Sequence, residues 1–250
     1  MNSSRVLSSR TVSGEIRPMT GVHGIAALAV VAYHYFDHAG VALRPWQHAY
    51  LVVDLFFMLS GLVLALNYAL SVTLGAGCES YVAFVKKRIA RVFPLYIAVT
   101  FIQTLYDLSK HVLLGLLMPV TWNLKAMLAN MFLVQAWGIS HSVVMPAWSL
   151  RTEFAAYVLF PVLVALAIGS RAAMAWCVSA LMIFLLMTAA TGGHDCSGYG
   201  GYLNVIQGDE LHPLMRCIAG FTFGLLAYRL VSRMRVGALA SPATHSRCSQ

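Results

Sequence analysis

The chain has 250 residues, of which 59% are hydrophobic and only 10% are charged, and its formal net charge is +8. Soluble domains carry roughly a quarter charged residues, so this composition excludes an ordinary water-soluble domain. The basic residues lie in short segments beside apolar stretches, a pattern that reflects membrane topology and argues against a nucleic-acid partner.

Six stretches are apolar enough to form membrane helices, at about residues 22–36, 49–70, 92–108, 148–168, 172–191 and 214–230. The stretch 111–137 is also apolar, but Pro119, Asn123, Lys125 and Asn130 interrupt it. It could form one short span, two half-spans or a re-entrant segment. The sequence predicts an all-α fold, a polytopic transmembrane helix bundle with about six to eight apolar membrane segments.

Loop charge decides between these alternatives, because Lys and Arg beside membrane spans favour the cytoplasm. If the stretch 111–137 makes no net crossing, most of the 17 basic residues fall on one side, with a cytoplasmic N-terminus. One more crossing would move Arg171 and the basic cluster in residues 229–247 to the outside. We therefore predict six crossings, with His34, Asp54 and the start of span 148–168 toward the outer face.

Residues 1–235 are predicted to form one membrane domain, and residues 236–250 a polar, disordered tail. The five cysteines show no metal-ligand spacing, so we expect them to be packing residues and expect no metal site.

His34 lies in the first span, with Asp37 and His38 about one helical turn further on. Histidine is the usual side chain for moving protons near neutral pH, which makes His34 a candidate base. The alternative is a polar residue that ends the span at the membrane interface. His23 stands eleven residues earlier, about 16 Å away on the same side of the helix.

Two carboxylates lie in or at the edge of apolar spans, where an ionised side chain costs ~2.5–3.5 kcal/mol on insertion scales. Asp54 could orient an imidazole or pair with Arg44. Ser60 and Gly61 in the same span indicate close helix packing. Glu153 begins another span, with Tyr157 one turn on, and is a candidate site residue.

Arg88 and Arg91 share one face of a basic entry into the third span. Guanidinium groups make paired, charge-assisted hydrogen bonds to phosphate, so the two could bind a phosphorylated ligand. The alternative is a basic anchor that contacts anionic lipid headgroups.

Five sequence blocks in this order resemble the integral membrane acyltransferase family 3, which acylates bacterial surface glycans and other small acceptors. They are residues 17–34 (RPMTGVHGIAALAVVAYH), 53–61 (VDLFFMLSG), 88–96 (RIARVFPLY), 148–161 (WSLRTEFAAYVLFP) and 213–224 (PLMRCIAGFTFG).

The resemblance implies a multi-pass enzyme of the bacterial cytoplasmic (inner) membrane, in contact with membrane lipid. It implies an O-acyltransferase that moves an acyl group from acetyl-CoA or another acyl-CoA to a hydroxyl of a glycan or lipid-linked sugar, as in cell-envelope polysaccharide. His34, as base or acyl relay, would be catalytic with Asp54 and Glu153. Arg88 and Arg91, together with His23, would contact the donor phosphates.

The chain departs from the family pattern at two points. His23 stands where the family usually has Arg or Lys, and the family generally has more spans than this chain carries, so we expect an incomplete member. Two other functions stay open: an inactive truncated member, and a proton-coupled transporter with His34, Asp54 and Glu153 as its proton path. Transporters often contain inverted repeats, and this sequence shows no mirrored half.

Overall fold

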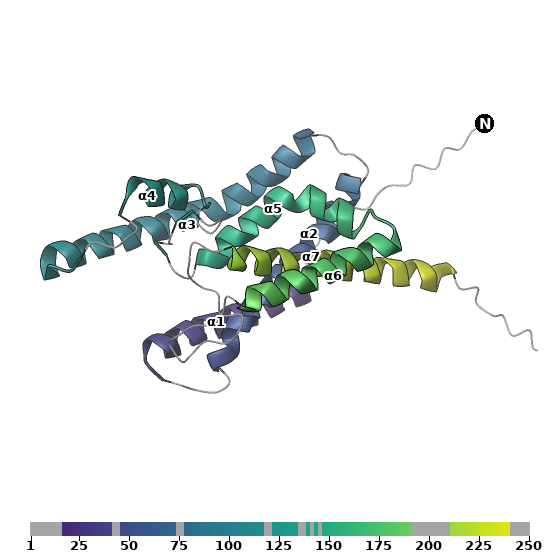
Figure 1. Cartoon of the computed structure of the whole chain (residues 1–250). Coiled ribbons are helices and arrows are strands. Elements are labelled where there is room, and N and C mark those ends of the chain that lie inside the picture. The colour runs from purple at the N-terminus through teal and green to yellow at the C-terminus, as the bar shows by residue number, and fades with distance from the viewer. Residues whose placement is uncertain are drawn as a thin grey trace, which may run out of the picture.

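The computed structural model describes residues 17–41, 46–73, 78–117, 122–134, 139–140, 143–144, 147–191 and 211–240. Within these ranges the chain is helical and contains no strand (Figure 1). The elements are α1 (Arg17–His38), the 3-10 helix η1 (Trp46–Leu51), α2 (Val52–Thr73), α3 (Cys78–Leu114), α4 (Leu124–Met131), α5 (Trp148–Ala167), α6 (Ala172–Thr191) and α7 (His212–Ala240). The predicted all-α fold is confirmed.

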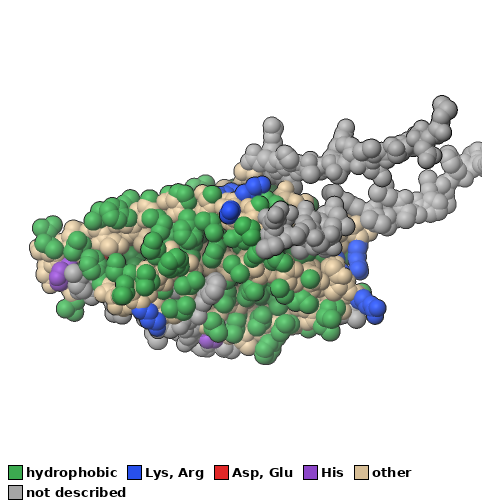
Figure 2. Space-filling view, turned by 90° about the horizontal axis from the view of Figure 1, so that it is seen from above, with side chains coloured by type: hydrophobic (Ala, Val, Ile, Leu, Met, Phe, Trp, Pro, Cys, Tyr) green, Lys and Arg blue, Asp and Glu red, His purple; other side chains and the backbone are tan. Residues whose placement is uncertain are grey.

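Five of the described helices are long and apolar enough to cross a membrane. They cover Met19–His38, His48–Ala69, Tyr81–Leu114, Trp148–Ala167 and His212–Met234, and α6 adds a shorter apolar segment, Met174–Thr188. Hydrophobic side chains cover most of the face shown in Figure 2. Because lipid is the solvent that accepts such a surface, the protein is a multi-pass membrane protein.

Three helices run parallel to one another through the centre of the bundle. Asp54, early in α2, forms an ion pair with Arg216 at the start of α7. Phe57, one turn further along α2, packs against Trp148 at the start of α5. Arg229, late in α7, donates to the carbonyl of Ala167 at the end of α5. Helices α2, α5 and α7 therefore cross the bundle in the same direction.

The other three apolar helices run the opposite way. Tyr33, late in α1, packs on Tyr50 just before α2, and Thr188, late in α6, contacts Met215 early in α7. Tyr81, near the start of α3, donates to the carbonyl of Val158 in the second half of α5. Since α3 is antiparallel to α5, the segment that joins them begins and ends on the same side of the bundle.

The joining segment contains one described helix, α4, of eight residues. Eight helical residues extend only about 12 Å, too short for a hydrocarbon core of about 30 Å. The side chain of Asn123 caps α4 by accepting from the Ala126 amide at 2.8 Å, and the Tyr96 hydroxyl holds it to α3 through the Asn130 carbonyl at 2.8 Å. This agrees with the prediction that residues 111–137 make no net crossing; Pro119 lies outside the described residues.

The closest helix contact is between α2 and α7. A Cβ atom added to Gly61 would lie 2.1 Å from the carbonyl oxygen of Phe221, and one added to Gly224 would lie 2.1 Å from that of Met58. The two backbones therefore touch directly, as small residues allow between membrane helices. This contact bears out the packing role expected for Gly61.

Several predicted features fall at or beyond the edges of the described chain. Helix α7 continues to Ala240, past the boundary expected at residue 235, and residues 241–250 lie outside the described part. Cys177 is exposed and Cys217 is buried, and both are free thiols; the other three cysteines lie outside the described side chains.

Candidate functional site

A cavity of about 1500 Å³ lies between α1, α2, α3, α5 and α7. It is larger than the ~300–1,000 Å³ of typical small-molecule pockets. Its ionisable lining residues are His23 in α1, Arg88 and Arg91 in α3, Glu153 and Tyr157 in α5, and Tyr228 in α7. These come from four helices, so the cavity forms only when the bundle is assembled. It can hold a ligand that is long and partly anionic.

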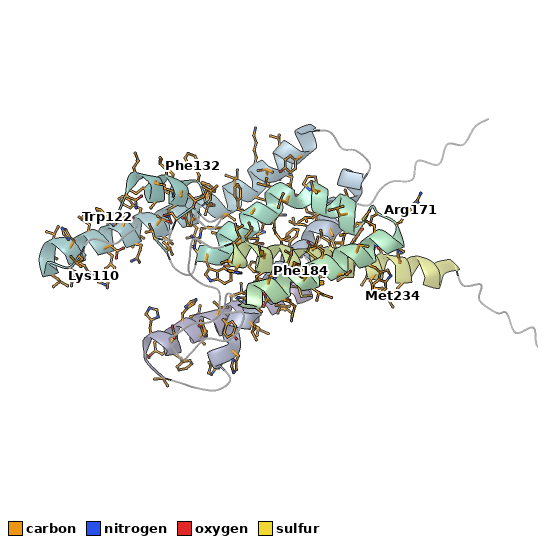
Figure 3. The ribbon with its side chains drawn as sticks, viewed as in Figure 1. Lys110, Trp122, Phe132, Arg171, Phe184 and Met234 are labelled. Carbon is orange, nitrogen blue, oxygen red and sulfur yellow. The ribbon has the colours of Figure 1, made fainter. Side chains whose placement is uncertain are left out.

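The cavity lies toward the end of the bundle where α1 begins and α7 finishes. Its lining includes Met19 and Thr20 from the first residues of α1, and Val231 and Ser232 from the late part of α7. Arg171 and Met234 mark this end of the bundle in Figure 3, and Lys110 marks the opposite end. Because basic residues beside membrane spans favour the cytoplasm, we expect the end with Arg171 and Met234 to face the cytoplasm.

Aromatic rings, rather than carboxylates, hold Arg88. Its guanidinium carbon lies 5.6 Å from the ring centre of Phe84, 5.8 Å from that of Tyr157 and 5.9 Å from that of Tyr68. The Arg88 Nε is buried without a hydrogen-bond partner. Rings attract a cation without neutralising it, so Arg88 keeps its positive charge for a ligand.

The second arginine, Arg91, follows one turn later and is exposed along the same wall. Within the part of the chain that the structure describes, neither Arg88 nor Arg91 forms an ion pair with a carboxylate. Two guanidinium groups on one cavity wall, neither paired with a carboxylate of the described residues, are suited to phosphate, whose oxygens accept charge-assisted bonds from each.

Glu153 faces the cavity from the first turns of α5 and accepts a hydrogen bond of 2.5 Å from the Tyr157 hydroxyl. Tyr157 thus contacts both the carboxylate and, through its ring, Arg88. This contact fixes the orientation of the Glu153 side chain and leaves its second oxygen for another partner.

His23 lies on α1 against the ring of Phe56, with ring centres 5.6 Å apart. Its Nδ1 is 3.0 Å from the Met19 carbonyl, which requires the proton on Nδ1. Nε2 is then the ring atom left for a ligand in the cavity.

Among the described residues, Asp54 contacts no imidazole. Its two oxygens accept from the Arg216 Nε at 2.7 Å and Nη2 at 2.9 Å. Arg216 is fully buried, and its guanidinium carbon lies 5.4 Å from the Trp148 ring centre. The sequence had offered an imidazole or Arg44 as the partner of Asp54. The structure gives Arg216 in place of the imidazole, and Arg44 lies outside the described residues.

His34 is partly buried near the end of α1, with its ring 5.2 Å from that of Tyr33. Neither His34 nor Asp54 is among the residues that line the cavity. The structure therefore brings Glu153 together with His23, Arg88 and Arg91, and places His34 and Asp54 further along the bundle.

The sequence analysis missed two features of this region. Arg216 appears in a sequence block, but only the assembled bundle pairs it with Asp54; the available indication was two opposite charges in separate apolar spans. The rings around Arg88 come from α2, α3 and α5, which sequence alone does not bring together. In the described residues, no group of three or more His, Cys, Asp or Glu side chains could hold a metal ion.

Comparison with known proteins gives two curated relatives. Protein 2 in the picA locus of Rhizobium radiobacter is 37% identical over 102 residues, which cover 41% of this chain and 50% of that protein. Acyltransferase MdmB of Streptomyces mycarofaciens is 30% identical over 158 residues, 57% of this chain and 38% of that protein. The aligned part thus spans half or less of each relative's length.

No solved structure is significantly similar to the chain. The sequence profile of the acyltransferase domain, acyltransferase family 3, matches residues 19–239, which include every described helix except the first residues of α1 and the last of α7. The match covers the five sequence blocks almost completely. The chain therefore belongs to acyltransferase family 3.

Proposed function

We propose that the protein is an O-acyltransferase of the bacterial cytoplasmic membrane. It moves an acyl group, in particular acetyl, from a CoA thioester to a hydroxyl of a glycan or lipid-linked sugar. The observation that carries the proposal is the cavity in which Arg88 and Arg91 lie without a carboxylate partner among the described residues. The glycan acceptor and the acetyl group rest on the family resemblance.

In this proposal the phosphates of the donor lie against Arg88 and Arg91, and His23 adds a contact from the opposite helix. His34 is about 16 Å further along α1 than His23, so the donor extends from the arginines toward His34 with its thioester end leading. A long, flexible CoA arm suits that separation, and the size of the cavity supports it.

The transfer itself is an exchange of one bond to the acyl carbon. His34 takes the proton of the acceptor hydroxyl, the hydroxyl oxygen bonds to the acyl carbon, and the carbon–sulfur bond breaks. The proton then passes from His34 to the departing thiolate, so the products are an ester and free CoA. In an alternative order His34 carries the acyl group before passing it to the acceptor. Glu153 orients the reacting groups, and Asp54 supports the site through Arg216.

The test is acyl transfer by the purified protein in lipid nanodiscs, with radiolabelled acetyl-CoA and a lipid-linked sugar fraction. Arg88→Gln with Arg91→Gln should raise the apparent donor constant at least tenfold, because each charge-assisted contact contributes roughly 1.5–3 kcal/mol. The matched control is Lys86→Gln with Lys87→Gln, which removes equal charge from exposed positions of α3 that do not line the cavity.

An unchanged donor constant in the arginine variant, or equal changes in both variants, would leave only a lipid-anchoring role for the arginines. Absence of transfer by correctly folded wild-type protein to any glycan or lipid-linked sugar would contradict the proposed function. It would then favour an inactive family member or a transporter.

A further inference from the structure

Arg216 joins three elements through one side chain. Its Nε and Nη2 bind the two oxygens of Asp54 on α2, and Nη2 also donates to the Tyr50 carbonyl in η1 at 2.9 Å. The guanidinium carbon lies 6.0 Å from the Tyr50 ring centre. A residue of α7 thus fixes both the start of α2 and the short helix before it.

The contact continues from η1 to α1. The Tyr50 ring packs edge-on against Tyr33, with centroids 6.2 Å apart. Tyr33 is 6% exposed and Tyr50 is 7% exposed, and with Ala49 they form a small core separate from that of the central helices. Tyr33 directly precedes His34, and the two rings are 5.2 Å apart.

This support matters because α1 has few other anchors at that end. Its main contacts in the described chain are with η1 and α2, and Leu28, Val31 and Tyr35 on its remaining surface are more than 60% exposed. The position of His34 therefore depends on η1, and η1 depends on Arg216.

The ion pair between Asp54 and Arg216 is not needed to hold α2 against α7. The two helices already touch at Gly61 and Gly224, and a buried ion pair is often no more stabilising than apolar side chains of similar volume. The third bond, from Nη2 to the Tyr50 carbonyl, adds nothing to the α2–α7 contact and acts only on η1.

We propose that Arg216 is a positioning residue for acyl transfer, acting through Tyr50 and Tyr33 on the segment of α1 that carries His34. The inference rests on the proposed function, in which His34 is the reacting imidazole. A misplacement of about 1 Å costs on the order of 100-fold in rate. Loss of Arg216 should therefore lower kcat and leave the donor KM unchanged, because the proposed donor contacts line the cavity and Arg216 does not.

The experiment compares Arg216→Gln with Arg229→Gln, in the full chain in nanodiscs. Arg229 is a matched control on the same helix: it is 6% exposed and binds the carbonyls of Ala167 and Ser170 at the end of α5. Both variants lose bonds of a buried guanidinium. Only Arg216→Gln should speed hydrogen–deuterium exchange in residues 28–51 and lower kcat by 10- to 100-fold.

A double variant, Asp54→Leu with Arg216→Met, separates positioning from stability. It removes both charges, so its thermal midpoint should recover relative to Arg216→Gln while kcat stays low and exchange in η1 stays fast. Recovery of kcat with the midpoint would show that Arg216 serves stability alone. Unchanged exchange in residues 28–51 of Arg216→Gln would overturn the proposed coupling.

The exchange measurement needs no catalysis. If the wild-type protein transfers no acyl group, the proposed function fails, and the coupling of Arg216 to α1 is still decided by exchange. If transfer occurs and exchange does not respond to Arg216→Gln, only the positioning inference fails.

Discussion

At the scale of single residues, Arg88 and Arg216 show two ways to hold a buried guanidinium. Arg216 gives its charge to the carboxylate of Asp54, whereas Arg88 is surrounded by the rings of Tyr68, Phe84 and Tyr157. In an ion pair the positive charge is neutralised by a carboxylate of the protein, whereas aromatic rings leave the positive charge able to bind an anionic ligand. This contrast is consistent with the ligand contact proposed for Arg88 and with a fixed internal role for Arg216.

His34→Ala should abolish acyl transfer without disturbing membrane insertion, because it removes a proton carrier and adds no charge. General base catalysis contributes typically 10²–10⁴-fold, so we expect a fall of that size in kcat. His38→Ala is the control: it removes an exposed imidazole one turn further along the same helix. Steady-state transfer assays measure both, and more than about a tenth of wild-type activity in His34→Ala would exclude it as the base.

His23→Arg should lower the apparent donor constant at neutral pH. Arginine adds a permanent charge and a planar set of N–H donors, and a charge-assisted contact to phosphate is worth roughly 1.5–3 kcal/mol. We expect a decrease of about tenfold, and none in the neutral control His23→Gln. A donor titration at fixed acceptor measures the change. If His23→Arg binds the donor more weakly, the imidazole of His23 has a role that a guanidinium cannot take.

At the scale of elements, the α2–α7 crossing is set by glycine. Gly224→Ala places a Cβ atom 2.1 Å from the Met58 carbonyl oxygen and 2.8 Å from the Leu62 nitrogen, so the helices must separate. Such overpacking costs about 1–3 kcal/mol, which exceeds the gain of up to about 1 kcal/mol from helix propensity. The thermal midpoint of the detergent-solubilised protein should fall.

The control for this variant is Gly24→Ala on α1, where an added Cβ meets nothing within 4 Å. It gains helix propensity without a clash, so its thermal midpoint should stay level or rise. Equal shifts in the two variants would mean that the α2–α7 contact is not limited by backbone approach.

The helices themselves could be predicted from apolar runs, because hydropathy and span length are local properties of the sequence. The start of α3 could not be predicted from hydropathy, because the helix begins at Cys78 whereas the apolar run begins near residue 92. Lys86, Lys87 and Arg88 lower the hydropathy of its first turns but do not prevent helix formation. At this end of α3 the helix therefore extends beyond the apolar run from which a membrane span is predicted.

The site was predicted only in part. The sequence identified Arg88, Arg91, Glu153 and His23, and the structure places all four around one cavity. It could not predict which helices are neighbours, and so it offered an imidazole or Arg44, but not Arg216, as the partner of Asp54. Asp54 and Arg216 are 162 positions apart in the sequence, and the parallel packing of α2 and α7, which no local pattern encodes, brings them together.

At the scale of the whole molecule, the directions of the helices predict which ends share one side of the membrane. Cysteines introduced at Leu117, just after α3, and at Met234, late in α7, should lie on opposite sides; both positions are exposed, by 94% and 65%. The five native cysteines would first be replaced by alanine. A membrane-impermeant thiol reagent on intact spheroplasts should label Leu117→Cys and spare Met234→Cys.

Permeabilised spheroplasts provide the control, in which both cysteines should react. Labelling of Met234→Cys in sealed spheroplasts would contradict the assignment of the late part of α7 to the cytoplasm, and with it the approach of a cytoplasmic donor to Arg88 and Arg91.

The parallel pairing of α2 with α7 also bears on how the protein is made. A ribosome delivers α2 to the membrane long before α7, because 162 residues separate Asp54 from Arg216. During that interval the carboxylate lacks Arg216, the guanidinium that it binds in the assembled bundle, and an unpaired charge in lipid is costly. Helix α2 must therefore wait beside water, the insertion machinery or an earlier helix until synthesis reaches α7. The α2–α7 contact thus forms only after α3, α5 and α6 have been made, and these helices enter the membrane around an unfinished centre.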